Sequence, residues 1–418
     1  MVRRPTLWFA FTALAGLAAC SSNETGSTIS TSASSSSGGI QLNPNASDVP
    51  INGTPKDLVD QFYKGDAVFD LPFRDSDGLG PLYVRTSCGD CHENGSRGPG
   101  LVQKMAVVAA DGVTASADQS ELPFGHTIRP YVTAGAVTPI LAPTGVSNVL
   151  VSSRVGPPVL GRGYMEAIAD SEIERLEKEQ SKRTDGIHGV INRVTYASET
   201  NTETDFPRYT KGQQNLIGRF GLKARIASLD EFAADALQGD MGLTSPMRPD
   251  ELPNPDGLTD DLKPGVDLDL EHINKLATYM RLIAIPPRVA NKAGEKAFAA
   301  ANCNVCHAPS LATRSDYPIA ELAGIEAEVF TDFLLHDMGP KLADGMTDGT
   351  STSRLWRTAP LIGTRFSRIF LHDGRAGSIE EAILAHDDTG SEGSGSVALF
   401  NKLSAADRAA LLDYVGAL

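Results

Sequence analysis

Two segments of this chain combine cysteine and histidine at a spacing that can do chemistry. They are CGDCH at residues 88–92 and CNVCH at residues 303–307. A C-x-x-C-H segment taken alone is compatible with a zinc site, a redox dithiol or an attachment site for haem. The three chemistries differ, because zinc is held by thiolates and imidazoles, a dithiol exchanges electrons at sulfur, and haem is bonded covalently through both thiols.

The arrangement of the two segments favours haem. A zinc ribbon needs its cysteine pairs close together, and these pairs lie about 215 residues apart, although folding could still bring them together. A thioredoxin-like site has no need of a histidine after both pairs. In a c-type site the thiols add to the haem vinyl groups and the adjacent imidazole lies under the iron as the proximal ligand. We therefore predict two covalent haem c groups, held by Cys88, Cys91, His92, Cys303, Cys306 and His307.

The residues before the two motifs repeat. The first motif is preceded by GDAVF at 65–69 and the second by GEKAF at 294–298. The stretch AGEKAFAAANC predicts one amphipathic helix that runs directly into the second motif. In the first half, the glycines and prolines of DLPFRDSDGLGPLYVRTS predict a loop between the helix and the motif.

Each half also closes on a similar predicted helix. DLEHINKLATYMRLIAIPP is stopped by Pro286 and Pro287, and LSAADRAALLDYVGAL begins after Ser404 as N-cap. The expected fold is therefore mainly α, with few strands, in two cytochrome c-like domains at 55–287 and 288–418. The first domain carries a large loop-rich insertion at 100–265.

The N-terminus reads as an export signal. Arg3 and Arg4 precede an apolar run at 7–19, which has the length of a signal-peptide core. The run ends in LAAC and resembles a bacterial lipobox, with Cys20 as the acylated residue; a plain signal peptide cut nearby is the alternative. Ser21 after this cysteine favours the outer membrane, facing the periplasm. We expect a signal at 1–20, a flexible Ser-rich tether at 21–54, and no membrane contact except the lipid anchor at Cys20.

The composition limits the partners. The hydrophobic content of 41% and charged content of 21% are ordinary for a globular protein. The formal net charge of −15 disfavours nucleic acid and permits a basic partner.

Several longer stretches carry a resemblance to a known family. They are GLGPLYVRTSCGDCH, RVGPPVLGRGYMEAI, IGRFGLKA, GDMGLTSP, FLLHDMGPKLADG and LWRTAPLIG…FLHDGRAGSIEEAILAH. Across roughly residues 60–418 the chain resembles the bacterial di-haem cytochrome c peroxidase superfamily, and more closely its di-haem oxidoreductase or "thiol oxidoreductase" branch. The resemblance implies that a donor reduces the C-terminal haem and that peroxide is reduced at the N-terminal haem.

The resemblance also implies the sixth ligands of the two irons. At the C-terminal haem the position that is usually methionine in the peroxidases holds His386, with His372, His336 and Met338 as alternatives. Two histidines give a lower potential than a methionine–histidine pair.

The distal side of the N-terminal haem is harder to assign. His126, in the phrase FGH, is the candidate distal ligand, with Met165 and Met241 as weaker alternatives. Glu166 is the candidate acid/base for peroxide. A loop histidine and an ordinary helix-surface glutamate are the alternative interpretations of His126 and Glu166.

Other residues match the superfamily near the second haem. Trp356 either assists electron transfer between the haems or packs against one of them. Arg357 and Arg375 are candidate partners of haem propionates. The superfamily also binds calcium between its domains, so a Ca²⁺ ion is a further expectation.

The sequence thus predicts a peroxidase-type oxidoreductase acting on hydrogen peroxide, with a small cytochrome or cupredoxin as donor. Two alternatives stay open: a purely electron-transferring di-haem cytochrome, and an enzyme that uses high-valent iron to oxidise a protein or small molecule. A thiosulfate-oxidising type is disfavoured, because it needs a cysteine ligand and no cysteine is spare.

Overall fold

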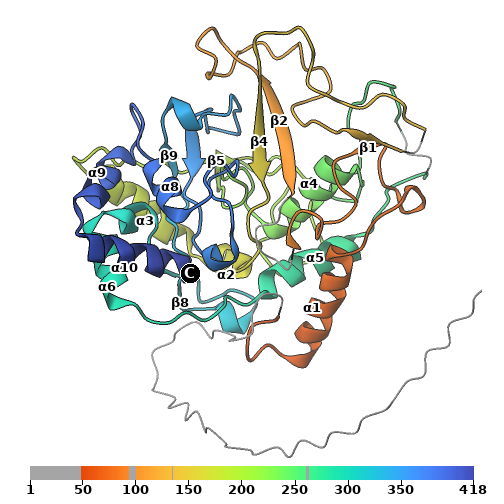
Figure 1. Cartoon of the computed structure of the whole chain (residues 1–418). Helices are drawn as coiled ribbons and strands as arrows, with labels where there is room; N and C mark the ends of the chain where they lie inside the picture. The colour runs from red at the N-terminus through yellow and green to blue at the C-terminus, as the bar shows by residue number, and fades with distance from the viewer. Residues whose placement is uncertain (1–48, 94–99, 134, 260–262) are drawn as a thin grey trace, which may run out of the picture. The chain divides into compact units, whose positions relative to one another are not determined.

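Helices carry most of the regular structure in the computed structural model, which describes residues 49–93, 100–133, 135–259 and 263–418 (Figure 1). All of these residues belong to one unit, 38–418. The predicted mainly α class agrees with the ten α-helices in this part of the chain, whereas the predicted division into domains at 287/288 stays a prediction. The helices are α1 Lys56–Phe69, α2 Arg162–Ala167, α3 Asp170–Gln180, α4 Leu229–Met241, α5 Leu270–Leu282, α6 Lys292–Ala300, α7 Cys303–Cys306, α8 Ile379–Leu384, α9 Ser394–Lys402 and α10 Ala405–Gly416.

Short antiparallel ribbons complete the fold. Each pairs two strands, and the longest, β2 with β4, runs from Leu101↔Val155 to Val107↔Val149. The other pairs are β1–β3, β5–β6, β7–β8 and β9–β10. The strands are β1 Leu82–Tyr83, β2 Leu101–Val107, β3 Tyr131–Val132, β4 Val149–Val155, β5 Arg193–Val194, β6 Leu216–Ile217, β7 Leu311–Ala312, β8 Glu326–Ala327, β9 Leu335–Asp337 and β10 Leu355–Arg357.

The predicted insertion at 100–265 is less loop-rich than its composition implies. It contains the β2–β4 ribbon and the helices α2, α3 and α4. Helix α4 starts after Ser228, whose hydroxyl accepts a hydrogen bond from the Glu231 amide, and ends at Gly242 in the left-handed region. The Ser228 N-cap and the Gly242 C-cap are visible in the sequence. The many glycine and proline residues elsewhere in the interval nevertheless favoured the prediction of a loop.

The sequence repeat around the motifs corresponds to a repeated helix crossing. Helix α1 packs on α5 at Gly65, where a Cβ atom would lie 2.7 Å from the Cβ of Tyr279. Helix α6 packs on α10 at Gly294, where a Cβ atom would lie 2.3 Å from the Cβ of Tyr414. In both halves, therefore, a glycine lets the opening helix approach the closing helix closely, against a tyrosine.

Two predicted helix boundaries are right and one is wrong. Helix α10 begins after Ser404, whose hydroxyl accepts from the Asp407 amide at 3.1 Å, and α5 ends at Leu282, before the two prolines. The helix before the second motif does not run into it. It ends at Ala300, and Asn302 turns the chain with a φ of 57° before α7 begins. Asparagine tolerates this left-handed conformation better than most residues.

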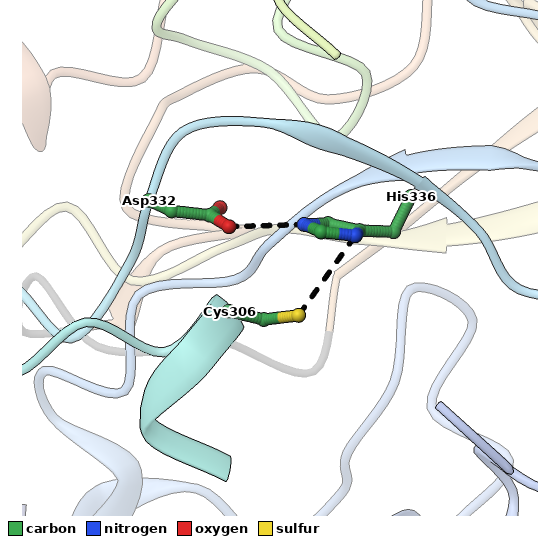
Figure 2. Close-up of side chains that lie close together, drawn as sticks. All are labelled: Cys306, Asp332 and His336. Atoms are coloured by element: carbon green, nitrogen blue, oxygen red, sulfur yellow. Dashed lines mark hydrogen bonds and ion pairs between the residues drawn. The ribbon is translucent and has the colours of Figure 1, made fainter. Parts of the chain in front are cut away.

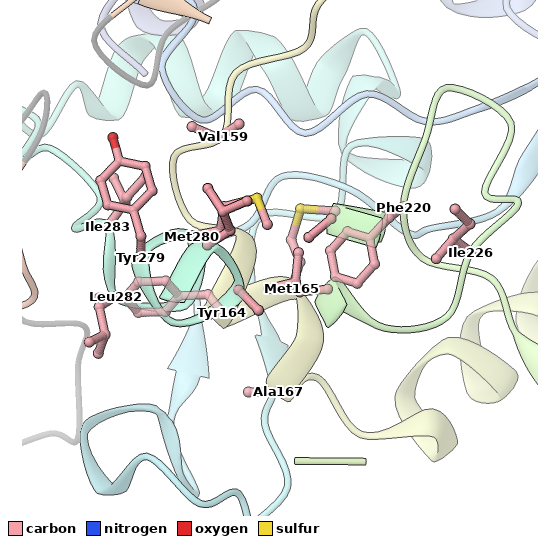
Figure 3. Close-up of a cluster of buried hydrophobic side chains, with 14 of the residues drawn as sticks. Val159, Tyr164, Met165, Ala167, Phe220, Ile226, Tyr279, Met280, Leu282 and Ile283 are labelled. Atoms are coloured by element: carbon pink, nitrogen blue, oxygen red, sulfur yellow. The ribbon is translucent and has the colours of Figure 1, made fainter. Parts of the chain in front are cut away.

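The main core forms where α2, α5 and the loop at 220–226 meet. Figure 3 shows Met165 with Tyr164, Phe220 and Met280 in this cluster. The side chains of Met165 and Met241 are both buried among the apolar side chains of this core. Both serve as packing residues there, and neither belongs to a C-x-x-C-H segment.

The fold begins earlier than the predicted tether boundary at residue 54. Pro50 pairs with Ile283, and the buried Ile51 donates its amide to the Leu282 carbonyl at 2.9 Å. Pro50 and Ile51 of the predicted tether are therefore attached to the fold, and the tether itself stays a prediction. The predicted signal, Cys20 and the rest of the tether lie outside the described residues. Among the residues described, no helix is both long and apolar enough to span a bilayer.

Candidate functional site

The two C-x-x-C-H motifs form the same turn. His92 donates its amide to the Cys88 carbonyl, and His307 donates its amide to the Cys303 carbonyl, each at 2.9 Å. None of the four thiols of the motifs is in a disulfide. Burial raises the pKa of Cys88 to about 12 and of Cys91 to about 11. A redox dithiol needs a lowered thiol pKa, so this environment disfavours that chemistry.

A large cavity opens beside the second motif. Its empty space, part of which is open to solvent, is about 1620 Å³. We call it the second-motif cavity. It brings together residues from separate parts of the chain that the sequence singled out: Cys303, Cys306, His307, Trp356, Arg357 and His386.

The imidazoles of His307 and His386 have the tautomer and the neutral charge that suit metal binding in this cavity. Nδ1 of His307 lies 3.3 Å from the Phe330 carbonyl, and Nδ1 of His386 lies 2.7 Å from the Ala382 carbonyl. A carbonyl only accepts, so both Nδ1 atoms carry the proton and the lone pair of each neutral ring lies on Nε2. Burial lowers the pKa of His307 to about 4 and also lowers that of His386, which keeps both rings neutral.

His336 lines the same cavity but is held by carboxylates. Its Nε2 lies 2.9 Å from Asp332 and its Nδ1 lies 2.7 Å from Glu392 (Figure 2 shows the Asp332 contact). The Cys306 sulfur lies 3.8 Å from Nδ1. Neither ring nitrogen is free, so this alternative ligand is less suited to iron than His386. Cys306, Asp332 and His336 are close enough to hold a metal ion, but the predicted haem attachment would use the Cys306 thiol.

Trp356 forms part of the cavity wall together with His372. Their rings stack with centroids 3.8 Å apart and planes 18° apart. The buried Lys223 ammonium lies 4.0 Å from the Trp356 centroid. The third alternative ligand, Met338, also lines this cavity.

The buried Arg357 fits an anionic group in the cavity. Its guanidinium donates to the carbonyls of Gly221 at 2.9 Å and Thr358 at 3.0 Å, and no ion pair reaches it within the described part of the chain. Burial lowers its pKa to about 10, against the opposing effect of Asp332. A haem propionate would offset this charge, so the donor set fits haem. Arg375 pairs with Asp373 instead and is half-exposed.

The first motif is packed against glycines. A Cβ on Gly156 would lie 2.9 Å from Cε1 of His92, and one on Gly100 would lie 2.4 Å from the Cys91 sulfur. Burial lowers the pKa of His92 to about 4, so its ring is neutral. Its buried Nδ1 has no hydrogen-bond partner among the described residues. A neutral buried imidazole with a free ring nitrogen fits iron ligation, as in the second motif.

His126, the candidate distal ligand of the first haem, is held by a backbone carbonyl. Nδ1 of His126 lies 3.0 Å from the Met105 carbonyl, and the structure gives it no contact with the first motif in the described residues. Its assignment as a ligand stays a prediction.

Glu166 is in a buried ion pair. Arg281 contacts it at 2.6 Å and 3.1 Å, Tyr317 donates to it at 2.7 Å, and the Leu229 amide donates at 2.8 Å. Burial opposes its charge, but Arg281 outweighs burial and lowers the pKa of Glu166. Arg281 also pairs with Asp230. The assignment of Glu166 as acid/base stays a prediction, and these contacts favour a structural role.

Sequence reasoning missed Lys223, Asp240 and the carboxylates around His336. Asp240 is close enough to Cys88 and Cys91 to raise both thiol pKa values, after burial. The stretches IGRFGLKA and GDMGLTSP, which carried the family resemblance, contain Lys223 and Asp240, and FLLHDMGPKLADG contains His336. Charged residues inside such stretches were therefore the available signal.

The chain belongs to the family described as "Di-haem oxidoreductase, putative peroxidase", whose model matches residues 142–418, more than half of the chain. It is thus an oxidoreductase of a di-haem class. A comparison with curated proteins gave no match. Among solved structures it is similar to a hydrazine synthase chain of Kuenenia stuttgartiensis. The identity is 15% and the TM-score 0.41, over 95% of this chain and 100% of that one, which is too low to define the fold.

Proposed function

We propose that this protein is a di-haem c oxidoreductase of the peroxidase type, with two unequal haem sites. The observation that carries the proposal is the second-motif cavity, where two neutral histidines present free Nε2 atoms. Bound at the two motifs, haem would supply one-electron redox chemistry, with a donor reducing the C-terminal site and hydrogen peroxide reduced at the N-terminal site.

The chain's own residues divide the work. The thiols of Cys303 and Cys306 would attach the second haem, and ligation of its iron by His307 and His386 would favour a low potential. Arg357 would hold a propionate. Cys88, Cys91 and His92 hold the first haem, and no histidine other than His92 is in contact with that motif in the described residues, which fits an open position for peroxide.

Reduction of peroxide to two waters needs two electrons and two protons, so the first site needs a proton donor. Asp240 is the carboxyl that supports this role best. It lies in electrostatic reach of both thiols of the first motif, and burial raises its pKa, against the opposing effect of Lys104. A raised pKa keeps a carboxyl protonated nearer to neutral pH.

The remaining parts of the proposal concern the location of the protein and its redox donor. The chain is exported and anchored by a lipid at Cys20 to the outer membrane, facing the periplasm. Its donor is a basic small cytochrome or cupredoxin, which the formal charge of −15 would attract.

Peroxide-dependent oxidation of a reduced, basic small cytochrome tests the proposal. The purified di-haem protein should catalyse it, and His386→Ala should lower the rate by at least about tenfold through loss of a strong ligand. His272→Ala, at a partly exposed histidine paired with Asp269, is the matched control and should keep the rate. A wild-type protein that consumes no peroxide with any reduced donor would leave the electron-transfer cytochrome as the better interpretation.

A further inference from the structure

The ring of Trp356 lies between a neutral ring and a cation. The His372 imidazole stacks 3.8 Å from its centroid, and the Lys223 ammonium lies 4.0 Å from it. One face of an indole has no room for both groups at this distance, so they occupy opposite faces. Within the described residues Trp356 is the only tryptophan.

This wall connects the surroundings of the two motifs. Trp356 and His372 line the second-motif cavity. The His372 carbonyl accepts a hydrogen bond from the Val155 amide at 2.8 Å. The next residue, Gly156, packs against the His92 ring. Trp356 is therefore linked to the His92 ring by a short chain of contacts through His372, Val155 and Gly156.

Lys223 is fixed in place rather than swinging toward solvent. Its side chain is fully buried. The ammonium donates to the carbonyls of Thr352 at 2.8 Å, Ser353 at 3.2 Å and Leu355 at 2.9 Å, and it lies 3.3 Å from Asp344. This is far more support than a packing lysine needs, and it holds a positive charge over one face of the indole.

A cation in this position disfavours oxidation of the ring. Loss of an electron from the indole would create a second positive charge next to the ammonium, and the favourable cation–π contact would become a repulsion. The indole N–H donates to the Leu342 carbonyl at 2.9 Å. A carbonyl is not a base that can take the proton, so the oxidised ring has no route to a neutral radical.

We propose that Lys223 is a positioning residue that keeps Trp356 reduced during turnover. The electrons that reduce peroxide in this di-haem protein then come from the donor and not from the indole. This inference rests on the proposed function. When no donor is present, each peroxide that is reduced to water takes two electrons and two protons from elsewhere. An indole can supply both by taking up one oxygen atom from water, which leaves hydroxytryptophan at position 356.

Peptide mass spectrometry of Trp356 tests the inference. The di-haem protein is treated with hydrogen peroxide without a donor, and the oxygenated fraction of Trp356 is measured. Lys223→Met should raise this fraction by at least about tenfold, whereas Lys223→Arg, which keeps the charge, should stay within about twofold of the wild type. Lys263→Met is the matched control, because its ammonium also donates to two carbonyls, those of Asp77 and Asp267. Equal oxidation in Lys223→Met and wild type would overturn the inference.

A second measurement separates this inference from the proposed function. A soluble one-electron photo-oxidant oxidises Trp356 without peroxide, so the comparison of variants holds even if the wild type proves not to be a peroxidase. It also works on the wild type alone, should Lys223→Met fail to fold. Burial lowers the pKa of Lys223 to about 8, so oxidation should rise several-fold between about pH 7 and about pH 9.5.

Asp344, Asp348 and Arg154 are the other charged groups around Lys223. The Arg154 guanidinium also lies over the Trp356 ring, 5.8 Å from its centroid. Burial lowers the pKa of His372 to about 4, so its ring stays neutral. A flat pH profile of photo-oxidation in the wild type would contradict the inference.

Discussion

His307 and His386 line one cavity, and each ring directs Nδ1 at a backbone carbonyl, at 3.3 Å and 2.7 Å. They come from separate segments, the end of α7 and the end of α8. Because the carbonyls fix the tautomer of both rings, the free lone pairs are the Nε2 atoms that a bound iron needs. In the described residues the first motif has one histidine, His92, and its buried Nδ1 has no hydrogen-bond partner. This difference is the basis on which we propose unequal sites.

Loss of a motif thiol should remove one haem only. We expect Cys303→Ser combined with Cys306→Ser to leave a protein with a single covalent haem, since thioether bonds need the thiols. The intact mass after denaturation measures this directly. The reciprocal pair, Cys88→Ser with Cys91→Ser, is the matched control and should lose the other haem. A doubly loaded variant would contradict covalent attachment at these cysteines.

The helix crossing at Gly294 should not tolerate a methyl group. An alanine Cβ would lie 2.3 Å from the Tyr414 Cβ and 2.5 Å from the Ala410 carbonyl. We expect Gly294→Ala to lower the free energy of unfolding by about 1–3 kcal/mol, measured by urea denaturation. Gly239→Ala in α4 is the control, because its Cβ would meet nothing within 4 Å. It should raise stability by about 0.5–1 kcal/mol. Equal effects at the two glycines would contradict the close crossing.

Removal of the Glu166 charge should destabilise the fold. Arg281 is almost fully buried, and Glu166→Gln would leave it with one carboxylate, Asp230. Breaking a buried pair typically costs about 3–5 kcal/mol, and here Asp230 makes the lower end the expectation. Glu172→Gln, at the more exposed pair with Arg175, should cost less than about 1 kcal/mol. A variant that keeps full stability but loses peroxide turnover would instead support Glu166 as the acid/base.

The buried pair of Asp332 and His336 should make stability depend on pH. Burial opposes the charge of His336, but the Cys306 thiol and then Asp332 outweigh it and raise its pKa well above the ordinary value. A raised folded-state pKa adds stability that is complete below the ordinary histidine pKa of about 6.5 and is lost as pH rises through the folded-state value. Asp332→Asn should therefore cost more free energy of unfolding at about pH 6 than at about pH 10. Asp316→Asn, at an exposed carboxylate, should show no such difference.

The sequence predicted those parts of the fold that depend on local signals. The N-cap of α10 at Ser404 and the end of α5 before Pro286 both depend on residues within a few positions of each other. The repeat of Gly65 and Gly294 also marked a real feature, because a close helix crossing admits no side chain there.

What could not be predicted depends on contacts between distant residues. The environment of Lys223 is formed by backbone carbonyls at 352–355, and that of Glu166 is formed by Arg281. In both cases the partner lies more than a hundred positions away in the sequence. Their sequence neighbourhoods look like ordinary surface charges. The break at Asn302 was missed because helix-forming residues surround it, and only its left-handed φ shows where the helix ends. The β2–β4 ribbon was missed because its strands lie in a glycine- and proline-rich interval.

A spectrum of the purified, half-reduced protein tests the central claim most directly. With the C-terminal haem reduced, unequal sites predict a low-spin haem held by His307 and His386 together with a high-spin, five-coordinate haem at His92 that binds cyanide. His386→Ala should then convert only the low-spin component. If both haems stay low-spin and cyanide leaves the spectrum unchanged, the account of a catalytic N-terminal site is wrong.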